Sequence, residues 1–214
     1  MSNSKRNSVI DSVPESTKLT KKLVVVGDGG CGKTCLLIVF TKYEFPTEYT
    51  PSFDNFQEYQ MNLDGEKVEL TLVDAIEAYD KLYPLYCRDA DVVLLCFSIC
   101  EPTSLSNVVN YWKPEVLDVH CPGVPILLVG NKQDLRHQPN DNFGRLTYAN
   151  DVRVEPVAYE GGLDAARRIG ALAYYECSAR TGQGAKEVFE AAAKVAVHAK
   201  KGPESRKKKG CVLS

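Results

Sequence analysis

One segment of the sequence has the residue types and the spacing of a phosphate-binding loop. Gly27-Asp28-Gly29-Gly30-Cys31-Gly32-Lys33-Thr34 matches the pattern GxxxxGK[ST]. Its glycines let the backbone curl so that successive N–H groups point at phosphate oxygens. Lys33 would bring a positive charge to the β- and γ-phosphates, and Thr34 a hydroxyl to Mg²⁺. A chance glycine-rich turn is the alternative, but the loop lies between a β-branched run (22–26) and an apolar run (35–40), as a strand–loop–helix phosphate site requires.

A second motif predicts which base is bound. Asn131-Lys132-Gln133-Asp134 follows the apolar run 125–129. The Asp134 carboxylate can accept hydrogen bonds from N1–H and the 2-amino group of guanine. Adenine lacks this pair of donors and would leave a buried charge unpaired, which disfavours it by roughly 10⁴ or more. Alone, such a tetrapeptide is usually a solvated turn, and a P-loop kinase or ATPase would require it to be coincidence. Its order after the phosphate loop predicts a guanine nucleotide.

The composition excludes several classes of protein. The chain has 214 residues, of which 44% are hydrophobic and 25% charged, so it is not wholly disordered. A net charge of −2 excludes a broadly basic nucleic-acid-binding protein, although six basic residues gather between Lys200 and Gly210. The longest apolar run, Val92 to Ile99, is too short to span a bilayer, and no signal peptide is present. We therefore expect an intracellular protein.

The eight cysteines do not form a disulfide or metal pattern. Cys96 and Cys100 lie in an apolar run, and Cys31 and Cys35 lie beside an expected helix start. No CxxC pair or histidine-rich motif accompanies them, so reduced thiols are predicted rather than disulfides.

Strand-like and helix-like segments alternate along the chain, which predicts an α/β fold: a mainly parallel sheet with helices on both faces. Asp64-Gly65 predicts a hairpin, and Pro114 argues against an unbroken helix. The domain is expected at 21–199, after a disordered leader (1–20) and before a basic tail (200–214). The predicted strands are 22–26, 57–63, 68–73, 91–97, 125–129 and 173–177, and the predicted helices are 35–40, 104–116, 164–169 and 187–199.

These motifs and several shorter ones resemble the Rho-family small GTPases of the Ras superfamily. The resemblance covers about 22–199 and the C-terminus, and it implies a G domain with a six-stranded sheet and a Rho-type insert at about 136–155. Gly30 and Glu155-Pro156-Val157 lean toward the RhoD/Rif branch. The shorter motifs are Phe45-Pro46, Tyr79-Asp80-Lys81-Leu82, Leu95-Cys96-Phe97-Ser98, Trp112-Lys113-Pro114-Glu115-Val116 and Cys177-Ser178-Ala179.

The resemblance implies GTP or GDP and Mg²⁺ as ligands. Asn131 would brace the loops, the Lys132 stem would cover the base, the Ala179 N–H would meet the guanine oxygen, and Phe45 would pack on the guanine edge. Thr34, Ser52 and, through a water, Asp74 would hold the metal. The whole nucleotide-binding set implied is Gly27, Asp28, Gly29, Gly30, Cys31, Gly32, Lys33, Thr34, Cys35, Phe45, Tyr49, Ser52, Asn131, Lys132, Asp134, Ser178, Ala179 and Arg180.

The two segments that resemble switches depart from the family pattern. Ser52 stands where the family has Thr and keeps the hydroxyl and the N–H. The segment from Asp74 to Tyr79 is two residues shorter than the family's, without the Gly that meets the γ-phosphate or the Gln that orients the attacking water. Ile76 cannot replace that Gln, and the charge of Glu77 would repel the γ-phosphate. Slow GTP hydrolysis is therefore expected, with no catalytic residue assigned and Lys33 stabilising phosphate charge.

Two alternatives to a slow GTPase stay open. The shortened segment can be a sequencing or splicing artefact. The chain can also be a non-catalytic pseudo-GTPase scaffold held in one nucleotide state.

The C-terminus predicts a lipid anchor. Cys211-Val212-Leu213-Ser214 fits the CaaX pattern, and the terminal Ser favours a farnesyl group. One lipid anchors only marginally, and the basic residues 206–209 supply a second signal, although such a run also fits a nuclear-localisation signal. The resemblance implies a monomer on the cytoplasmic face of the plasma membrane, with a cytosolic pool. Its partners would be exchange factors, activating proteins of little effect here, a guanine-dissociation inhibitor and actin-regulating effectors, with no nucleic acid.

Overall fold

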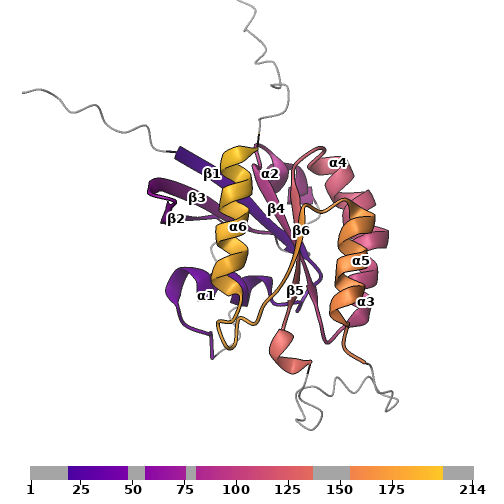
Figure 1. Ribbon diagram of the computed structural model, residues 1–214. Coiled ribbons are helices and arrows are strands. Elements are labelled where there is room, and N and C mark those ends of the chain that lie inside the picture. The colour runs from indigo at the N-terminus through magenta and orange to yellow at the C-terminus, as the bar shows by residue number, and fades with distance from the viewer. Residues whose placement is uncertain (1–18, 48–55, 76–80, 137–154, 200–214) are drawn as a thin grey trace, which may run out of the picture.

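A computed structural model describes residues 19–47, 56–75, 81–136 and 155–199, and in this part of the chain six strands form one sheet of order β2-β3-β1-β4-β5-β6. All neighbouring strands are parallel except β2 and β3, which form the hairpin expected at Asp64-Gly65. The predicted α/β fold class is thus confirmed (Figure 1). The strands are β1 (Leu19–Gly27), β2 (Phe56–Leu63), β3 (Glu66–Asp74), β4 (Val92–Ser98), β5 (Ile126–Asn131) and β6 (Ala173–Glu176).

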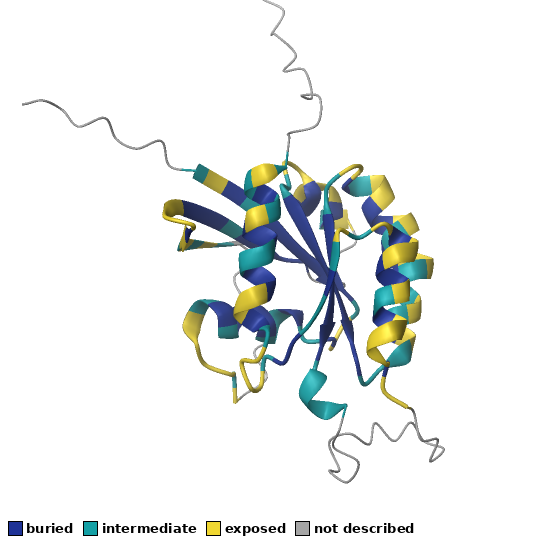
Figure 2. Cartoon of the chain, viewed as in Figure 1, coloured by how far each residue is buried: buried dark blue, intermediate teal, exposed yellow. Residues whose placement is uncertain are grey.

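Helices cover both faces of the sheet. One hydrophobic core lies between the sheet and α1 and α6, and a second lies between the sheet and the remaining helices. The central strands β4 and β5 are buried along their whole length, because helices cover them on both sides (Figure 2). The helices are α1 (Lys33–Lys42), α2 (Tyr83–Cys87), α3 (Pro102–Asn107), α4 (Asp118–His120), α5 (Tyr159–Ile169) and α6 (Ala185–His198), with a π-helical segment (Val108–Leu117) and a 3₁₀ turn (Gln133–Leu135).

Several elements differ from the sequence prediction, and three of the differences have a clear local cause or consequence. β1 begins at Leu19, which pairs with Val68, so the last two residues assigned to the leader belong to the sheet. α5 begins at Tyr159 rather than Asp164, through two glycines that sequence propensity disfavours in a helix. Around Pro114, which has no N–H to donate, the predicted helix continues as the π-helical segment.

The prediction that the cysteines are reduced is wrong for one pair. Cys87, the last residue of α2, and Cys121, just after α4, form a disulfide with their Cα atoms 5.2 Å apart. They are 34 positions apart in sequence and only the fold brings them together. Elsewhere in the described ranges the thiols are free, at Cys31, Cys35, Cys96, Cys100 and Cys177.

Several predictions fall outside the described residues. These are the leader before Leu19, the body of the proposed insert (137–154) and the tail from Lys200, including Cys211. Tyr49, Ser52 and residues 76–80 are also among them. None of the helices in the described ranges is long and apolar enough to cross a membrane.

Candidate nucleotide-binding site

The candidate site lies at the carboxyl ends of the parallel strands. β1 ends at Gly27, β3 at Asp74, β5 at Asn131 and β6 at Glu176. Because parallel strands place their carboxyl ends along one edge of the sheet, the phosphate loop and the candidate metal ligand Asp74 lie on that edge. The two motifs expected at the base, residues 131–134 (first base motif) and 177–179 (second base motif), lie there too. Open α/β sheets bind ligands there.

Two glycines give the phosphate loop its shape. Gly27 has a φ of +139°, and a Cβ at this position would lie 2.1 Å from the carbonyl oxygen of Cys96 in β4, so only glycine fits. Gly32 caps α1 with a φ of +99°, in the left-handed region. Helix α1 then begins at Lys33, so its N-terminal N–H groups and the positive end of its dipole face the loop.

The Lys33 ammonium lies across this loop. Its Nζ donates to the carbonyl oxygens of Gly27 (2.6 Å) and Asp28 (2.8 Å), and the residue is only 7% exposed. A buried ammonium held by backbone carbonyls is a fixed positive charge where the loop would meet phosphate. The role of Lys33 toward phosphate stays a prediction.

Asp74 and Thr34 fit a bound cation. Thr34 Oγ1 donates to Asp74 Oδ2 at 2.6 Å, whereas Oδ1 is buried without a hydrogen-bond partner. Burial raises the pKa of Asp74, because an ionised carboxylate loses its hydration there. A divalent cation would compensate this orphaned anionic oxygen, and hard oxygen ligands suit Mg²⁺.

The first base motif is fixed to the phosphate loop by two side chains. Asn131 Nδ2 donates to the Cys31 carbonyl at 3.0 Å, and Lys132 Nζ donates to the Gly30 carbonyl at 2.7 Å. Lys132 has a φ of +63°, which lets the backbone leave β5 and enter the 3₁₀ turn. Asp134 lies in this turn and is half-buried. Asn131 thus holds this motif against the phosphate loop, and its role with a bound nucleotide stays a prediction.

The second base motif leaves β6 beside the first. The Gln133 N–H donates to the Cys177 carbonyl at 3.1 Å, which joins the two motifs. Ser178 is fully buried, and its Oγ accepts from the Thr181 N–H at 3.1 Å. These bonds fold the loop that carries Ala179, which is half-buried, and Arg180, which is exposed. An Ala179 N–H directed at a guanine oxygen stays a prediction.

For three of the predicted nucleotide-binding residues, the described part of the chain gives no contact with the rest of the site. Phe45 follows α1 in a loop and is 40% exposed, so its packing on guanine stays a prediction. Tyr49 and Ser52 lie outside the described residues. Cys35, by contrast, is half-buried in the first turn of α1, where burial raises the pKa of its thiol and the charges of Lys132 and Asp74 also act on it, so it does lie at this edge.

Sequence reasoning missed two sets of partners. It assigned Asp28 to the phosphate loop without expecting that Asn107 Nδ2 (2.7 Å) and Trp112 Nε1 (2.5 Å) donate to its carboxylate. It also gave no role to Arg136 or Glu176, which form an ion pair behind the base motifs. Both sets join residues 40 or more positions apart, so no local pattern indicates them.

Comparison with known families agrees with this arrangement. A model of the Ras family matches residues 22–198, well over half of the chain. The match runs from β1 to the last residue of α6, and so includes the phosphate loop, Asp74 and both base motifs. Ras-family proteins are GTPases that bind guanine nucleotide with Mg²⁺ and are regulated by exchange factors and activating proteins. The chain therefore belongs to the Ras family of small GTPases.

Proposed function

We propose that this GTP-binding molecular switch is of the Rho type, is anchored to a membrane by a lipid, and hydrolyses GTP slowly. The observation that carries the binding proposal is the joint placement of Lys33, the Thr34–Asp74 pair and the joined base motifs at one edge of the sheet. Lys33 would hold the β- and γ-phosphates, and Thr34 and Asp74 the Mg²⁺, which neutralises phosphate charge when bound. Asp134 would select guanine.

The proposal of slow hydrolysis depends on the residues that come after Asp74. Phosphoryl transfer needs a stabilised γ-phosphate charge and an oriented water, because little other chemistry is left for the protein to do. Lys33 would supply the positive charge that stabilises the γ-phosphate. Beyond Asp74, Ala75 is buried and its N–H donates to the Val25 carbonyl at 3.0 Å, so it continues the sheet. Only residues 76–80 then separate it from the next described residue, and none of them is a Gln or a Gly.

Single-turnover hydrolysis tests this proposal. The purified chain is loaded with GTP and Mg²⁺ and compared with a variant whose loop reads Asp-Thr-Ala-Gly-Gln-Glu. This variant carries Ile76→Gly, a Thr inserted after Asp74 and a Gln inserted before Glu77. The variant is expected to hydrolyse bound GTP at least about tenfold faster, since it regains the water-orienting amide. Equal rates would contradict slow hydrolysis. Failure of the native chain to bind GTP, or equal competition by ATP, would contradict the guanine site itself.

The Rho assignment rests on the short motifs and on an insert at about 136–155. It is tested by loading the chain with GDP or a non-hydrolysable GTP analogue and measuring binding to the isolated GTPase-binding domain of a Rho-type actin-regulating effector. Binding that depends on the GTP analogue is expected. Binding only to Ras-type effector domains would contradict the Rho assignment.

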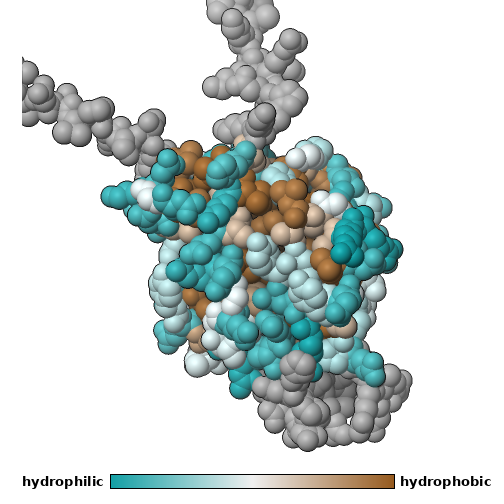
Figure 3. Space-filling view, viewed as in Figure 1, coloured by the Kyte–Doolittle hydropathy of each residue, from teal (hydrophilic) through white to brown (hydrophobic). Residues whose placement is uncertain are grey.

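The membrane proposal rests on Cys211 and the basic tail. Helix α6 ends at His198 at the upper end of Figure 1, and apolar side chains gather beside that end in the space-filling view (Figure 3). Leu172, which precedes β6 at the same end of the sheet, is 63% exposed. A lipid attached to the tail would bring this end toward the bilayer.

Fractionation of cells expressing variants tests the anchor. Cys211→Ser should move the protein to the cytosol, while Cys100→Ser, a control at a free cysteine inside the domain, should not. Neutralising the four basic residues 206–209 should weaken membrane retention without blocking lipidation. Membrane retention of Cys211→Ser would contradict the lipid anchor.

A further inference from the structure

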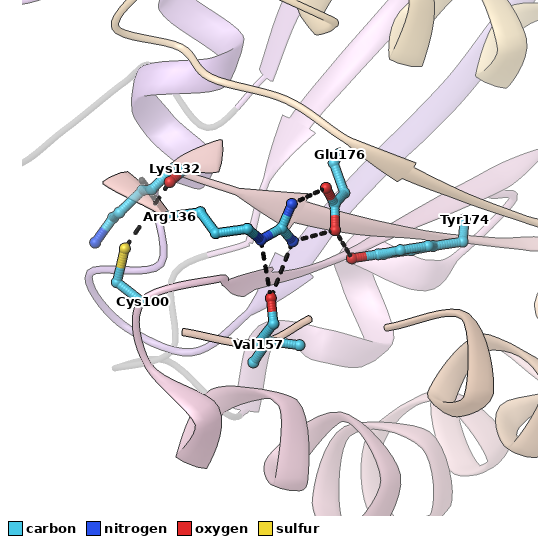
Figure 4. Close-up of polar contacts among 6 residues, drawn as sticks. All are labelled: Cys100, Lys132, Arg136, Val157, Tyr174 and Glu176. Carbon is cyan, nitrogen blue, oxygen red and sulfur yellow. Dashed lines mark hydrogen bonds and ion pairs between the residues drawn. The ribbon is translucent and has the colours of Figure 1, made fainter. Parts of the chain in front are cut away.

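We propose that Arg136, paired with Glu176, is a positioning residue that sets guanine selectivity by holding the turn that carries Asp134 (Figure 4). The inference rests on the proposed guanine site and adds a residue that touches no nucleotide.

The Arg136 guanidinium is held by two partners. Nη1 donates to Glu176 Oε2 at 2.6 Å and Nη2 pairs with Oε1, which makes the contact bidentate. Nε and Nη2 also donate to the Val157 carbonyl, at 3.1 and 2.9 Å. The Arg136 side chain is 17% exposed and that of Glu176 is 7% exposed, so solvent screens the pair little. The guanidinium is therefore fixed in position and in plane.

Glu176 is fixed in turn by Tyr174. The Tyr174 hydroxyl donates to Glu176 Oε1 at 2.6 Å, as Figure 4 shows. The Tyr174 ring occupies the space left by Gly162 of α5, where a Cβ would lie 2.2 Å from it. Burial and the bond to Glu176 raise the pKa of Tyr174, so its hydroxyl stays a donor. The carboxylate that receives Arg136 thus has a single orientation.

Arg136 controls one end of the turn that contains Asp134. Its N–H donates to the Gln133 carbonyl at 3.1 Å and closes the 3₁₀ turn, while its side chain fastens that end to Glu176. The other end is fastened by the Gln133 N–H to the carbonyl of Cys177, the residue after Glu176. Asp134 therefore lies between two attachments to the same short segment.

These attachments set the direction of the Asp134 carboxylate. Selecting guanine requires both carboxylate oxygens to meet N1–H and the 2-amino group, and a hydrogen bond weakens steeply once its distance and angle leave the normal range. Without the Arg136–Glu176 pair, the Gln133 N–H alone would tie the turn to the segment that follows β6, and the Arg136 end would keep only its bonds to the Val157 carbonyl. Asp134 would then still reach one donor, but the second bond would weaken.

Inosine diphosphate separates this role from a purely structural one. Inosine keeps N1–H and lacks the 2-amino group, so it makes one of the two bonds to Asp134. Loss of positioning should weaken GDP binding more than IDP binding. A general loss of stability should weaken both equally.

The test measures dissociation constants and dissociation rates of fluorescent GDP and IDP on the full chain. Arg136→Gln and Glu176→Gln should each raise the GDP dissociation rate by about tenfold and lower the preference for GDP over IDP at least about threefold, as expected for one weakened hydrogen bond to a charged group. Arg136→Lys keeps the charge without the bidentate geometry and should recover part of the preference.

Lys186→Gln is the matched control. It removes an exposed ion pair with Glu190 (3.3 Å) on α6, and should leave both nucleotides unaffected. Equal losses for GDP and IDP, or native preference in all three variants, would overturn the positioning role. If Arg136→Gln does not fold, Arg136→Lys and Glu176→Gln still show whether the preference for GDP over IDP falls. A native chain that does not prefer GDP to IDP would instead contradict the guanine site on which the inference rests.

Discussion

Trp112 Nε1 donates a hydrogen bond of 2.5 Å to Asp28 Oδ1, and this contact joins the phosphate loop to the π-helical segment. Asn107 Nδ2 donates to the other carboxylate oxygen at 2.7 Å. Trp112 is fully buried, and its ring meets the ring of Tyr83 edge-on, with centroids 5.8 Å apart. Tyr83 begins α2, shortly after residues 76–80. The phosphate loop is therefore linked through one indole to the helix that comes after the shortened segment.

Trp112→Phe should loosen the phosphate loop. The ring contact with Tyr83 is largely retained, but Asp28 loses one of its two donors, and a hydrogen bond to a charged group contributes about 1.5–3 kcal/mol. We expect the free energy of unfolding to fall by about that amount and GDP to bind about tenfold more weakly, measured by urea unfolding and fluorescent-nucleotide titration. Tyr111→Phe removes the hydroxyl of the next aromatic residue, keeps its ring against Trp112, and is the control. Unchanged GDP affinity in Trp112→Phe would contradict the link.

The local parts of the site were predictable from sequence because their signals are local. The apolar run before Gly27, the glycines of the loop and the order of the base motifs each follow from a few adjacent residues. The Arg136–Glu176 pair is not local, and the prediction missed it together with the Cys87–Cys121 disulfide. Long-range partners depend on the fold, which brings β5 beside β6 and α2 beside α4. The local sequence pattern does not indicate which side chains of these neighbouring elements come into contact.

Two glycines of the phosphate loop should respond differently to alanine. In Gly27→Ala the new Cβ would lie 2.1 Å from a backbone oxygen, so we expect a loss of stability of about 3 kcal/mol or more and no measurable GDP binding. In Gly30→Ala the Cβ meets nothing within 4 Å, and only the φ of +71° is strained, which costs about 1 kcal/mol. Urea unfolding and GDP titration measure both. Equal effects of the two substitutions would show that the close approach to Cys96 does not limit residue 27.

Asp74→Asn should stabilise the metal-free protein and abolish its response to Mg²⁺. Burial raises the pKa of Asp74, so ionisation is unfavourable for the fold. The penalty is absent below the ordinary carboxyl pKa, grows as pH rises, and is complete above the folded-state pKa. Near neutral pH, with EDTA, the neutral amide should raise the free energy of unfolding by about 1 kcal/mol.

Added Mg²⁺ and GDP should then stabilise the native chain much more than the Asn variant. The exposed Asp89 gives the control Asp89→Asn, which should behave as native in both conditions. If Asp74→Asn is less stable than the native chain in EDTA and is still stabilised by Mg²⁺, the assignment of Asp74 to the metal site is contradicted.

Asp134→Asn should change the base that the protein prefers. An amide can donate a hydrogen bond to the 2-carbonyl of xanthine but cannot accept from both guanine donors. We expect GDP affinity to fall about a hundredfold or more and xanthosine diphosphate to bind more tightly than GDP, in competition titrations. Asp118→Asn, on α4 and away from the base motifs, should keep the native preference. Retained GDP preference in Asp134→Asn would contradict the assignment of Asp134 to guanine.

The Cys87–Cys121 disulfide should make thermal stability depend on reductant. It closes a loop of 34 positions between α2 and α4, and a loop of that length loses about 3–4 kcal/mol of unfolded-state entropy on cross-linking. Dithiothreitol should therefore lower the Tm of the native chain by about 10 °C. Cys121→Ser should start at the lower Tm and respond little to dithiothreitol, whereas Cys100→Ser, at a free thiol, should behave as native. The same Tm for native and Cys121→Ser without reductant would mean that this disulfide does not hold α2 against α4 in solution.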